Sequence, residues 1–319
     1  MSFKVIVTRD FEHMSEVAAG LVVKNIRQVL KQQDLFTLGL ATGNSPTGLY
    51  KHLAKAANEG SFDSGRIRSF NLDEYVGLPG ENAQQRALHP ESYSFFMIQE
   101  LFSLLNKKFK ETNVPWGTLI DQKKLIRELK ANPADWREAG ADKGKAIVID
   151  RQAKSEYLNW VRKSILDAYA NKIVKCGGID LHIIGVGGRG HVAFHESGIP
   201  FKGNRMLLVK LDDSTVENAV KDGHFAGRKD SPSYAISMGA ELVYKARTVI
   251  LLANGPRKTE PIAESILNDP TPLVPISYGK LYASEGGQMI YVLDKAAAQK
   301  ILQNTKAVKK LGIEIENLN

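Results

Sequence analysis

Short strand-like runs alternate with longer helical patterns along most of this chain, and this alternation limits the fold more than any other feature. The runs are rich in β-branched and aliphatic residues and cover 3–8, 35–41, 67–72, 179–186, 206–211, 248–253 and 289–293. After the first run, apolar residues recur at helical spacing from Phe11 to about Gln33. Strands that alternate with helices form right-handed βαβ units. The sequence therefore predicts an α/β fold with a mostly parallel sheet and helices on both faces.

The organisation of the chain favours one domain over residues 1–319, because no internal repeat or long low-complexity linker interrupts it. The least regular region, from about Asn106 to Lys145, is polar and basic and is predicted to be an insertion. A second irregular stretch, Lys221–Ser233, is rich in charge, glycine and serine. It fits either a mobile lid or an ordinary exposed loop.

The net charge of +8 fits two readings. Nucleic-acid binding usually shows as a concentrated basic stripe, whereas the lysines and arginines here are scattered among acidic residues, so we expect no nucleic-acid partner. A positive potential also suits a cell-interior enzyme for anionic metabolites. A basic solvated surface without functional meaning fits the same charge.

The sequence argues against a membrane protein, a secreted protein and a metal-binding protein. The longest apolar runs are far shorter than the roughly 20 residues that a membrane span needs. The first residues lead directly into a strand-like run without a signal-peptide pattern. The single cysteine, Cys176, cannot form an internal disulfide, and no Cys/His cluster has zinc spacing. We therefore expect a cytoplasmic protein without a membrane partner or a metal.

Ligands of such sheets bind beyond the carboxyl ends of the strands, so the loops there are the candidate sites. In the first, Ala41–Gly48, Ser45 is predicted to cap a helix with Pro46 at its first position. Gly43 allows backbone N–H groups to approach a ligand, and the helix dipole favours an anion. Hydroxyl donors come from Thr42, Ser45 and Thr47. The loop fits a phosphate cradle or simply a capped helix start, since it matches neither common phosphate fingerprint.

The second loop carries two adjacent carboxylates, Asp73 and Glu74, at the end of the run 67–72. If the strand continues, neighbouring side chains point to opposite sides, so one can face a ligand while the other holds the loop. A carboxylate in such a pocket can transfer protons. A helix cap or a surface acid also fits the pair.

The third loop, Gly185–Gly198, begins with four glycines in six residues, which implies tight turns and close backbone approach. His191 follows at once, and Glu196 is near enough in sequence to orient its imidazole. A histidine at the end of a buried strand can exchange a proton with a substrate oxygen near neutral pH, although a lone histidine can also be structural.

Taken together, these loops resemble the glucosamine-6-phosphate deaminase (isomerase) family, which is related to the 6-phosphogluconolactonases. The resemblance lies in five segments that occur in order: Leu38–Pro46, Phe70–Leu78, His89–Tyr93, Ile179–Phe194 and Val249–Lys258. The ending Phe194-x-Glu196-x-Gly198 is similar to the deaminase branch. Several motifs in sequence order are more specific than any one of them.

The resemblance implies a Rossmann-like three-layer α/β/α sandwich and conversion of glucosamine 6-phosphate to fructose 6-phosphate and ammonia, without a cofactor. It implies that His191, supported by Glu196, handles the proton of the ring oxygen, and that Asp73 moves a proton between C2 and C1. It assigns the phosphate to the first loop and a later lysine, namely Thr42, Gly43, Asn44, Ser45, Thr47 and Lys258.

The chain departs from the family pattern at a few positions. Arg189 stands where an acid usually precedes the Gly-His pair. It either contacts a substrate group, such as a carboxylate or a second phosphate, or marks a weakened or absent deaminase activity. Thr215 stands where the pattern has an arginine that reaches the phosphate, unless Lys221, Arg228 or Arg257 replaces it. His195 and Ser197 replace the usual Asn and Pro.

Three functions are therefore compared, all with a small sugar phosphate as the partner. The first is an amino-sugar phosphate deaminase. The second is a 6-phosphogluconolactonase, which needs His191 but no proton shuttle by Asp73. The third is a sugar-phosphate-binding regulator without turnover, which Arg189 and Thr215 favour. The resemblance leaves a homo-oligomer open, because no motif match transfers the hexameric assembly of some deaminases.

Overall fold

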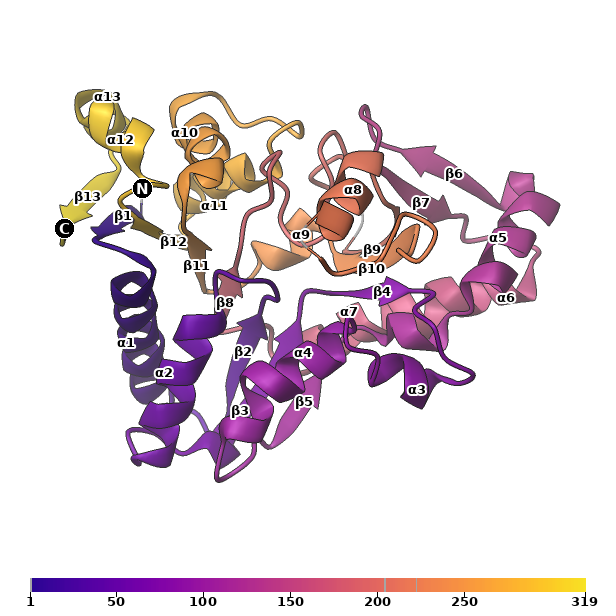
Figure 1. Cartoon of the computed structure of the whole chain (residues 1–319), viewed down its shortest axis with the longest axis horizontal. Coiled ribbons are helices and arrows are strands. Elements are labelled where there is room, and N and C mark those ends of the chain that lie inside the picture. The colour runs from indigo at the N-terminus through magenta and orange to yellow at the C-terminus, as the bar shows by residue number, and fades with distance from the viewer. Residues whose placement is uncertain (1, 204, 222) are drawn as a thin grey trace.

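The central sheet of the computed structural model is parallel throughout (Figure 1), and the structure describes residues 2–203, 205–221 and 223–319. In this part of the chain, eight strands lie in the order β13-β1-β12-β11-β8-β2-β3-β5. Their bounds are β1 Phe3–Thr8, β2 Phe36–Leu40, β3 Ile67–Asn71, β5 Glu111–Asn113, β8 Leu181–Ile184, β11 Thr248–Ala253, β12 Gln288–Asp294 and β13 Glu314–Asn317. The predicted mostly parallel sheet is confirmed.

Helices cover both faces of this sheet, because its strands are apolar on both sides. In β11, Ile250 and Leu252 pack in the same core as α1, α2 and α4, whereas Val249 and Leu251 pack in the core that contains α7, α10 and α11. Side chains of a strand alternate between the faces of a sheet, so one strand contributes to both cores. The helices in these cores are α1 Phe11–Val29, α2 Thr47–Asn58, α4 Tyr93–Glu100, α7 Ala168–Lys175, α10 Thr259–Leu267 and α11 Tyr278–Ser284. The predicted three-layer α/β/α sandwich is confirmed.

A second, smaller sheet lies beside the parallel one, to its right in Figure 1. It is antiparallel, in the order β4-β10-β9-β7-β6. Its strands are β4 Asp73–Val76, β6 Trp136–Ala139, β7 Lys145–Ile149, β9 Met206–Lys210 and β10 Tyr234–Met238. The run 206–211 is a strand as predicted, but its expected place among the parallel strands is wrong. A fully buried apolar run looks the same in either kind of sheet.

The region 106–145 contains more regular structure than its composition indicates. Its first strand, β5, joins the edge of the parallel sheet, and its last strand, β6, forms the edge of the second sheet. Between them lies α5 (Gln122–Ala131), which is mostly polar and buries only Leu125 and Leu129. Short, half-exposed elements carry a weak apolar pattern, which is why the sequence does not reveal them.

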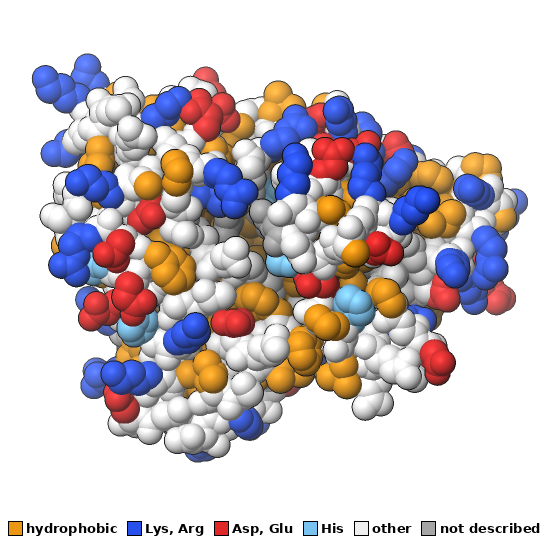
Figure 2. Space-filling view, in the orientation of Figure 1, with side chains coloured by type: hydrophobic (Ala, Val, Ile, Leu, Met, Phe, Trp, Pro, Cys, Tyr) orange, Lys and Arg blue, Asp and Glu red, His pale blue; other side chains and the backbone are white. Residues whose placement is uncertain are grey.

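The remaining helices connect the strands or lie at the periphery. They are α3 Ala83–Ala87, α6 Glu156–Trp160, α8 Asp213–Lys221, α9 Ala240–Val243, α12 Gln299–Gln303 and α13 Thr305–Lys310. A π-helical segment, Val161–Asp167, joins α6 to α7. No helix within the described ranges is long and apolar enough to cross a lipid bilayer. On the face drawn in Figure 2, basic side chains are interspersed with acidic ones.

The order of the strands decides where the three candidate loops meet. β11, β8, β2 and β3 are neighbours, and all of them run in the same direction. Their carboxyl ends lead into the loops that begin at Asn254, Gly185, Ala41 and Leu72. Loops at the same edge of adjacent parallel strands must lie close together.

Candidate active site

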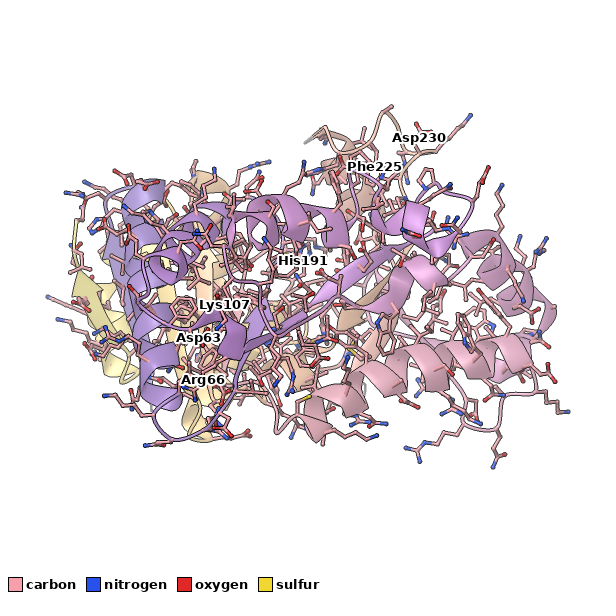
Figure 3. The ribbon with its side chains drawn as sticks, turned by 90° about the horizontal axis from the view of Figure 1, so that it is seen from below. Asp63, Arg66, Lys107, His191, Phe225 and Asp230 are labelled. Atoms are coloured by element: carbon pink, nitrogen blue, oxygen red, sulfur yellow. The ribbon has the colours of Figure 1, made fainter. Side chains whose placement is uncertain are left out.

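A pocket of about 190 Å³ lies beyond the carboxyl ends of these four strands. Residues from the three candidate loops, the start of α4 and the segment after β11 line it: Ala41, Thr42, Gly43, Asn44, Ser45, Pro46, Leu72, Asp73, Tyr93, Gly185, Val186, Gly187, His191, Ala193, Phe194 and Lys258. A larger groove of about 950 Å³ lies elsewhere, along β6 and β7, and contains none of the predicted site residues. Seen from below, His191 lies well inside the outline of the molecule, whereas Asp230 lies at its edge (Figure 3).

Asp73 is the buried carboxylate of this pocket, with only 5% of the residue exposed. It begins β4 and pairs with Ser237 of β10, so the second sheet fixes its backbone. None of the described residues donates a hydrogen bond to its carboxylate. Burial, together with the charge of the adjacent Glu74, raises the pKa of Asp73 well above its ordinary value. A carboxylate with a raised pKa is a stronger base than an ordinary one.

Glu74 points away from the pocket and holds the start of α4. One of its carboxylate oxygens accepts hydrogen bonds from the backbone N–H groups of Tyr75 and Tyr93, at 2.9 and 3.0 Å. The other accepts from the hydroxyl of Ser92 at 2.7 Å, and from the N–H and the hydroxyl of Ser94 at 3.1 and 3.2 Å. Burial raises the pKa of Glu74, and these donors offset part of the rise. The predicted division of tasks between two adjacent acids matches this geometry.

The first loop presents Thr42, Gly43, Asn44 and Ser45 to the pocket, and Lys258 also lines it. The Lys258 ammonium donates a hydrogen bond to the carbonyl of Val186 at 2.6 Å, which ties it to the third loop. Gly43 has φ of 92°, a left-handed conformation that glycine adopts without strain. A polar loop and a lysine that line the same small pocket are suited to an anionic group.

Two details of the first loop differ from the sequence prediction. Helix α2 begins at Thr47, and no side chain caps it, so the predicted cap at Ser45 is wrong. The Ser45 hydroxyl instead donates to the side-chain oxygen of Asn254 at 2.7 Å, a tertiary contact that outcompetes the local cap. The Thr47 hydroxyl donates to the carbonyl of Asn44 at 2.9 Å, and Thr47 does not line the pocket.

His191 lines the pocket, and Glu196 lies behind it. Glu196 is 3% exposed, and its carboxylate oxygen lies 3.5 Å from Nδ1 of His191. Burial raises the pKa of Glu196, but the hydrogen bond and charge of His191 and the hydroxyl of Thr215 outweigh burial, so the net shift is downward. The carboxylate is thus held in its charged form beside the imidazole, as in a histidine–acid pair.

Gly187 makes room for the imidazole. A Cβ atom added there would lie 1.7 Å from Nε2 of His191, far inside contact distance. Only a residue without a side chain therefore allows this orientation of the ring. At Gly188, next in the chain, an added Cβ would meet no atom within 4 Å.

Arg189 is not brought to the pocket lining. Its guanidinium forms ion pairs with Asp142 and, at 3.2 Å, with Asp212. The predicted contact between Arg189 and a substrate group therefore has no support in this arrangement. Arg228, considered as a substitute phosphate ligand, pairs with Asp213 and Glu217 on α8 and is about half exposed.

Sequence reasoning assigned no role to Tyr93, which lines the pocket. Its ring stacks on Phe194 of the third loop, with centroids 5.9 Å apart and planes 7° apart. Burial raises the pKa of Tyr93 well above the ordinary value, so the phenol stays protonated. The sequence signal for Tyr93 was the His-Pro-x-Ser-Tyr motif, of which it is the last residue. Glu74 fixes Ser92 and Tyr93 in this motif, because it accepts a hydrogen bond from each of them.

The stretch 221–233, expected to be a lid or an exposed loop, contacts β4 and the segment before α4; Asp222 lies outside the described residues. Phe225 is 6% exposed and contacts the ring of Tyr75 edge-on, with centroids 5.6 Å apart. The ring of His224 lies 2.8 Å from a carboxylate oxygen of Glu91. Within the described ranges, no cluster of three or more His, Cys, Asp or Glu residues could hold a metal ion.

The chain is similar in sequence to several curated enzymes over almost its whole length. It is 32% identical over 298 residues to a glucosamine-6-phosphate deaminase of Thermoanaerobacter pseudethanolicus, covering 93% of this chain and 95% of that one. It is 30% identical over 298 residues to a glucosamine-6-phosphate deaminase of Clostridium acetobutylicum, covering 93% of this chain and 100% of that one. No protein-family model matches the chain.

Solved structures give the same picture of the fold. A monomeric glucosamine-6-phosphate deaminase superimposes with a TM-score of 0.69 at 22% identity, covering 93% of this chain and 99% of that one. The 6-phosphogluconolactonase of Trypanosoma brucei superimposes with a TM-score of 0.61 at 16% identity, covering 94% of this chain and 100% of that one. At these identities the two structures support the fold alone.

Proposed function

The chain belongs to the glucosamine-6-phosphate deaminase family, and from this premise we propose that it converts glucosamine 6-phosphate and water to fructose 6-phosphate and ammonia. The observation that carries the proposal is the pocket itself. Asp73, His191 and Lys258 reach it from three separate strand ends, and each has the chemistry that one part of this reaction needs. Because phosphorylated sugars carry charge and stay inside the cell, we place the reaction in the cytoplasm.

Ring opening is the first step, and His191 is the group that we assign to it. A pyranose opens when its anomeric hydroxyl loses a proton and its ring oxygen gains one. An imidazole at the pocket wall can carry a proton between such oxygens near neutral pH. Glu196, 3.5 Å behind Nδ1, orients the ring and stabilises the protonated imidazolium.

Isomerisation is the second step, and Asp73 is its base. The carboxylate takes the proton from C2 of the open-chain aldehyde, and an enediol-type intermediate forms. Return of the proton to C1 leaves an imine at C2. Water then hydrolyses this imine, which releases ammonia and leaves the ketone of fructose 6-phosphate. A buried carboxylate without hydrogen-bond donors suits this step, since burial raises its pKa and makes it more basic.

We assign the phosphate to Thr42, Gly43, Asn44, Ser45 and Lys258, which all line the pocket. A charged lysine and polar groups from the loop can bind a dianion and fix the rest of the sugar. Binding energy gained at this non-reacting end keeps C1 and C2 near Asp73, and orientation of this kind supplies a large part of enzymatic rate enhancement.

The test is release of ammonium and fructose 6-phosphate from glucosamine 6-phosphate, with galactosamine 6-phosphate and 6-phosphogluconolactone assayed beside it. Ammonium from an amino-sugar phosphate supports the proposal. Hydrolysis of the lactone alone would overturn it in favour of a lactonase, and the Asp73→Asn variant would then keep most of that activity. Binding of glucosamine 6-phosphate without turnover, seen as a rise in Tm, would indicate a regulator.

A further inference from the structure

Glu196 has a second partner on the side opposite His191. The hydroxyl of Thr215 donates a hydrogen bond to the other carboxylate oxygen of Glu196, at 2.7 Å. The carboxylate is 3% exposed, so few water molecules can replace either partner. The backbone of Asp212 also favours the charged form of Glu196, so the direction in which Glu196 faces His191 depends on where Thr215 and the residue before α8 are held.

Thr215 lies in the first turn of α8, and Asp212 fixes that turn. One carboxylate oxygen of Asp212 accepts a hydrogen bond from the backbone N–H of Ser214 at 2.7 Å, which satisfies a free donor at the start of the helix. The other oxygen of Asp212 forms the 3.2 Å ion pair with Arg189. Asp212 is 3% exposed, so this ion pair is screened only weakly by solvent on the side of the acid.

Arg189 in turn joins α8 to two other segments. It lies two positions before His191, and its guanidinium also pairs with Asp142, in the turn before β7. The same Asp142 carboxylate accepts a hydrogen bond from the hydroxyl of Ser197 at 3.0 Å, one residue after Glu196. One guanidinium thus connects the loop of His191, the segment after Glu196 and the helix of Thr215.

We propose that Arg189 and Thr215 are a coupled pair of positioning residues: Arg189 holds α8 through Asp212, and Thr215 on that helix holds the Glu196 carboxylate against His191. Neither residue lines the pocket, so both act through Glu196 rather than on the sugar phosphate. The proposal deepens the assignment of His191 and Glu196 and rests on the proposed function for its kinetic test. It accounts for the departures at Arg189 and Thr215 with one set of contacts.

The kinetic test compares Thr215→Val, which keeps the shape but removes the hydroxyl, with Thr215→Ser, which restores a donor. With glucosamine 6-phosphate as the substrate, Thr215→Val should lower kcat about tenfold with little change in KM, because it removes a hydrogen bond to a charged group outside the pocket. Thr215→Ser should recover most of the loss. Ser214→Ala is the matched control on the same turn, since only the backbone of Ser214 is used.

Arg189→Met tests the coupling. It should lower kcat to a similar degree, and the double variant Arg189→Met/Thr215→Val should be no slower than the slower single variant, because both changes release the same carboxylate. Multiplicative losses would show that the two residues act independently and would overturn the coupled pair. An increase in KM at unchanged kcat for Thr215→Val would overturn the positioning role in favour of a substrate contact.

A second readout does not depend on turnover. In protein with ¹³C-labelled glutamate, the carboxyl signal of Glu196, assigned with Glu196→Gln, reports its titration. Its midpoint should rise in Thr215→Val and in Arg189→Met, since each loses support for the charged form, and should stay unchanged in Thr215→Ser and Ser214→Ala. Unchanged titration in both of the first two variants would overturn the proposal. If the unaltered protein releases no ammonium, the proposed function fails while this titration still decides the positioning role.

Discussion

Asp73 and Glu74 are adjacent, yet their carboxylates lie in opposite environments. Asp73 faces the pocket and receives no hydrogen bond from the described residues, whereas Glu74 accepts hydrogen bonds from five donors, four of them at the start of α4. Both are buried, so the difference lies in the donors and not in exposure. The alternation of side chains along β4 produces this division, and it leads to opposite expectations for the two acids.

Asp73→Asn should abolish most activity and stabilise the fold at neutral pH. Loss of the base should slow ammonium release by about 100-fold or more. Because burial raises the pKa of Asp73 in the folded state, its contribution to stability is full below the unfolded pKa and is lost as pH rises through the folded pKa. The amide removes that unfavourable charge beside Glu74. Assays of kcat and thermal unfolding at pH 7.5 check both effects, and a lower Tm would contradict the second.

Glu74→Ala should do the reverse and destabilise the chain without removing a reacting group. Five donors lose their acceptor at once, and the start of α4 is no longer tied to β4. Leaving buried donors unpaired typically costs about 1–3 kcal/mol each when no water replaces the acceptor, so we expect a loss of at least roughly 2 kcal/mol. Urea unfolding measures it. Glu91→Ala, an acid next to the same helix, is the control and should change stability much less.

The parts of the fold that follow from local pattern were predictable, and those that depend on distant contacts were not. The runs 3–8 and 248–253 coincide with β1 and β11, because mostly apolar residues mark a strand that is largely buried. β4 begins with two acids, and β6 lies at a sheet edge with polar residues, so neither has such a pattern. The strand geometry of β4 comes from β10, which lies far along the chain, whereas β6 pairs with β7, the next strand in sequence.

The candidate site shows the same limit. The rule that ligands bind at strand ends places Asp73, His191 and Lys258 at one edge, and they line one pocket, while their roles stay predictions. Ser45 and Arg189 could not be placed from sequence. The partner of Ser45 is Asn254, 209 positions away, and Arg189 pairs with acids 47 and 23 positions away. Each of these side chains has a local role that looks plausible until its distant partner is known.

Two buried histidines predict a loss of stability in mild acid. Burial lowers the pKa of both His182 and His195 from 6.5 to about 4 in the folded protein. Since the unfolded chain binds these protons at higher pH, stability should fall as pH decreases from about 6.5 to 4. Each histidine contributes at most about 1.4 kcal/mol per pH unit to the slope of unfolding free energy against pH. Urea unfolding across this range should show a slope smaller by about that amount in His182→Gln.

A wild-type protein whose stability is flat between pH 6.5 and 4 would contradict the prediction. So would an unchanged slope in His182→Gln, because the proton uptake would then belong to other groups.

Two neighbouring glycines of the third loop should respond very differently to the same substitution. In Gly187→Ala the new methyl group would lie 1.7 Å from Nε2 of His191, so the imidazole must turn away from its place beside Glu196. In Gly188→Ala the methyl group would meet no atom within 4 Å. If His191 carries the proton of the ring oxygen, Gly187→Ala should lower kcat by about 100-fold or more, as removal of a general acid–base group does, whereas Gly188→Ala should keep nearly full activity. Circular dichroism and Tm confirm that both variants are folded, and equal activities would mean that the position of the His191 ring does not govern the rate.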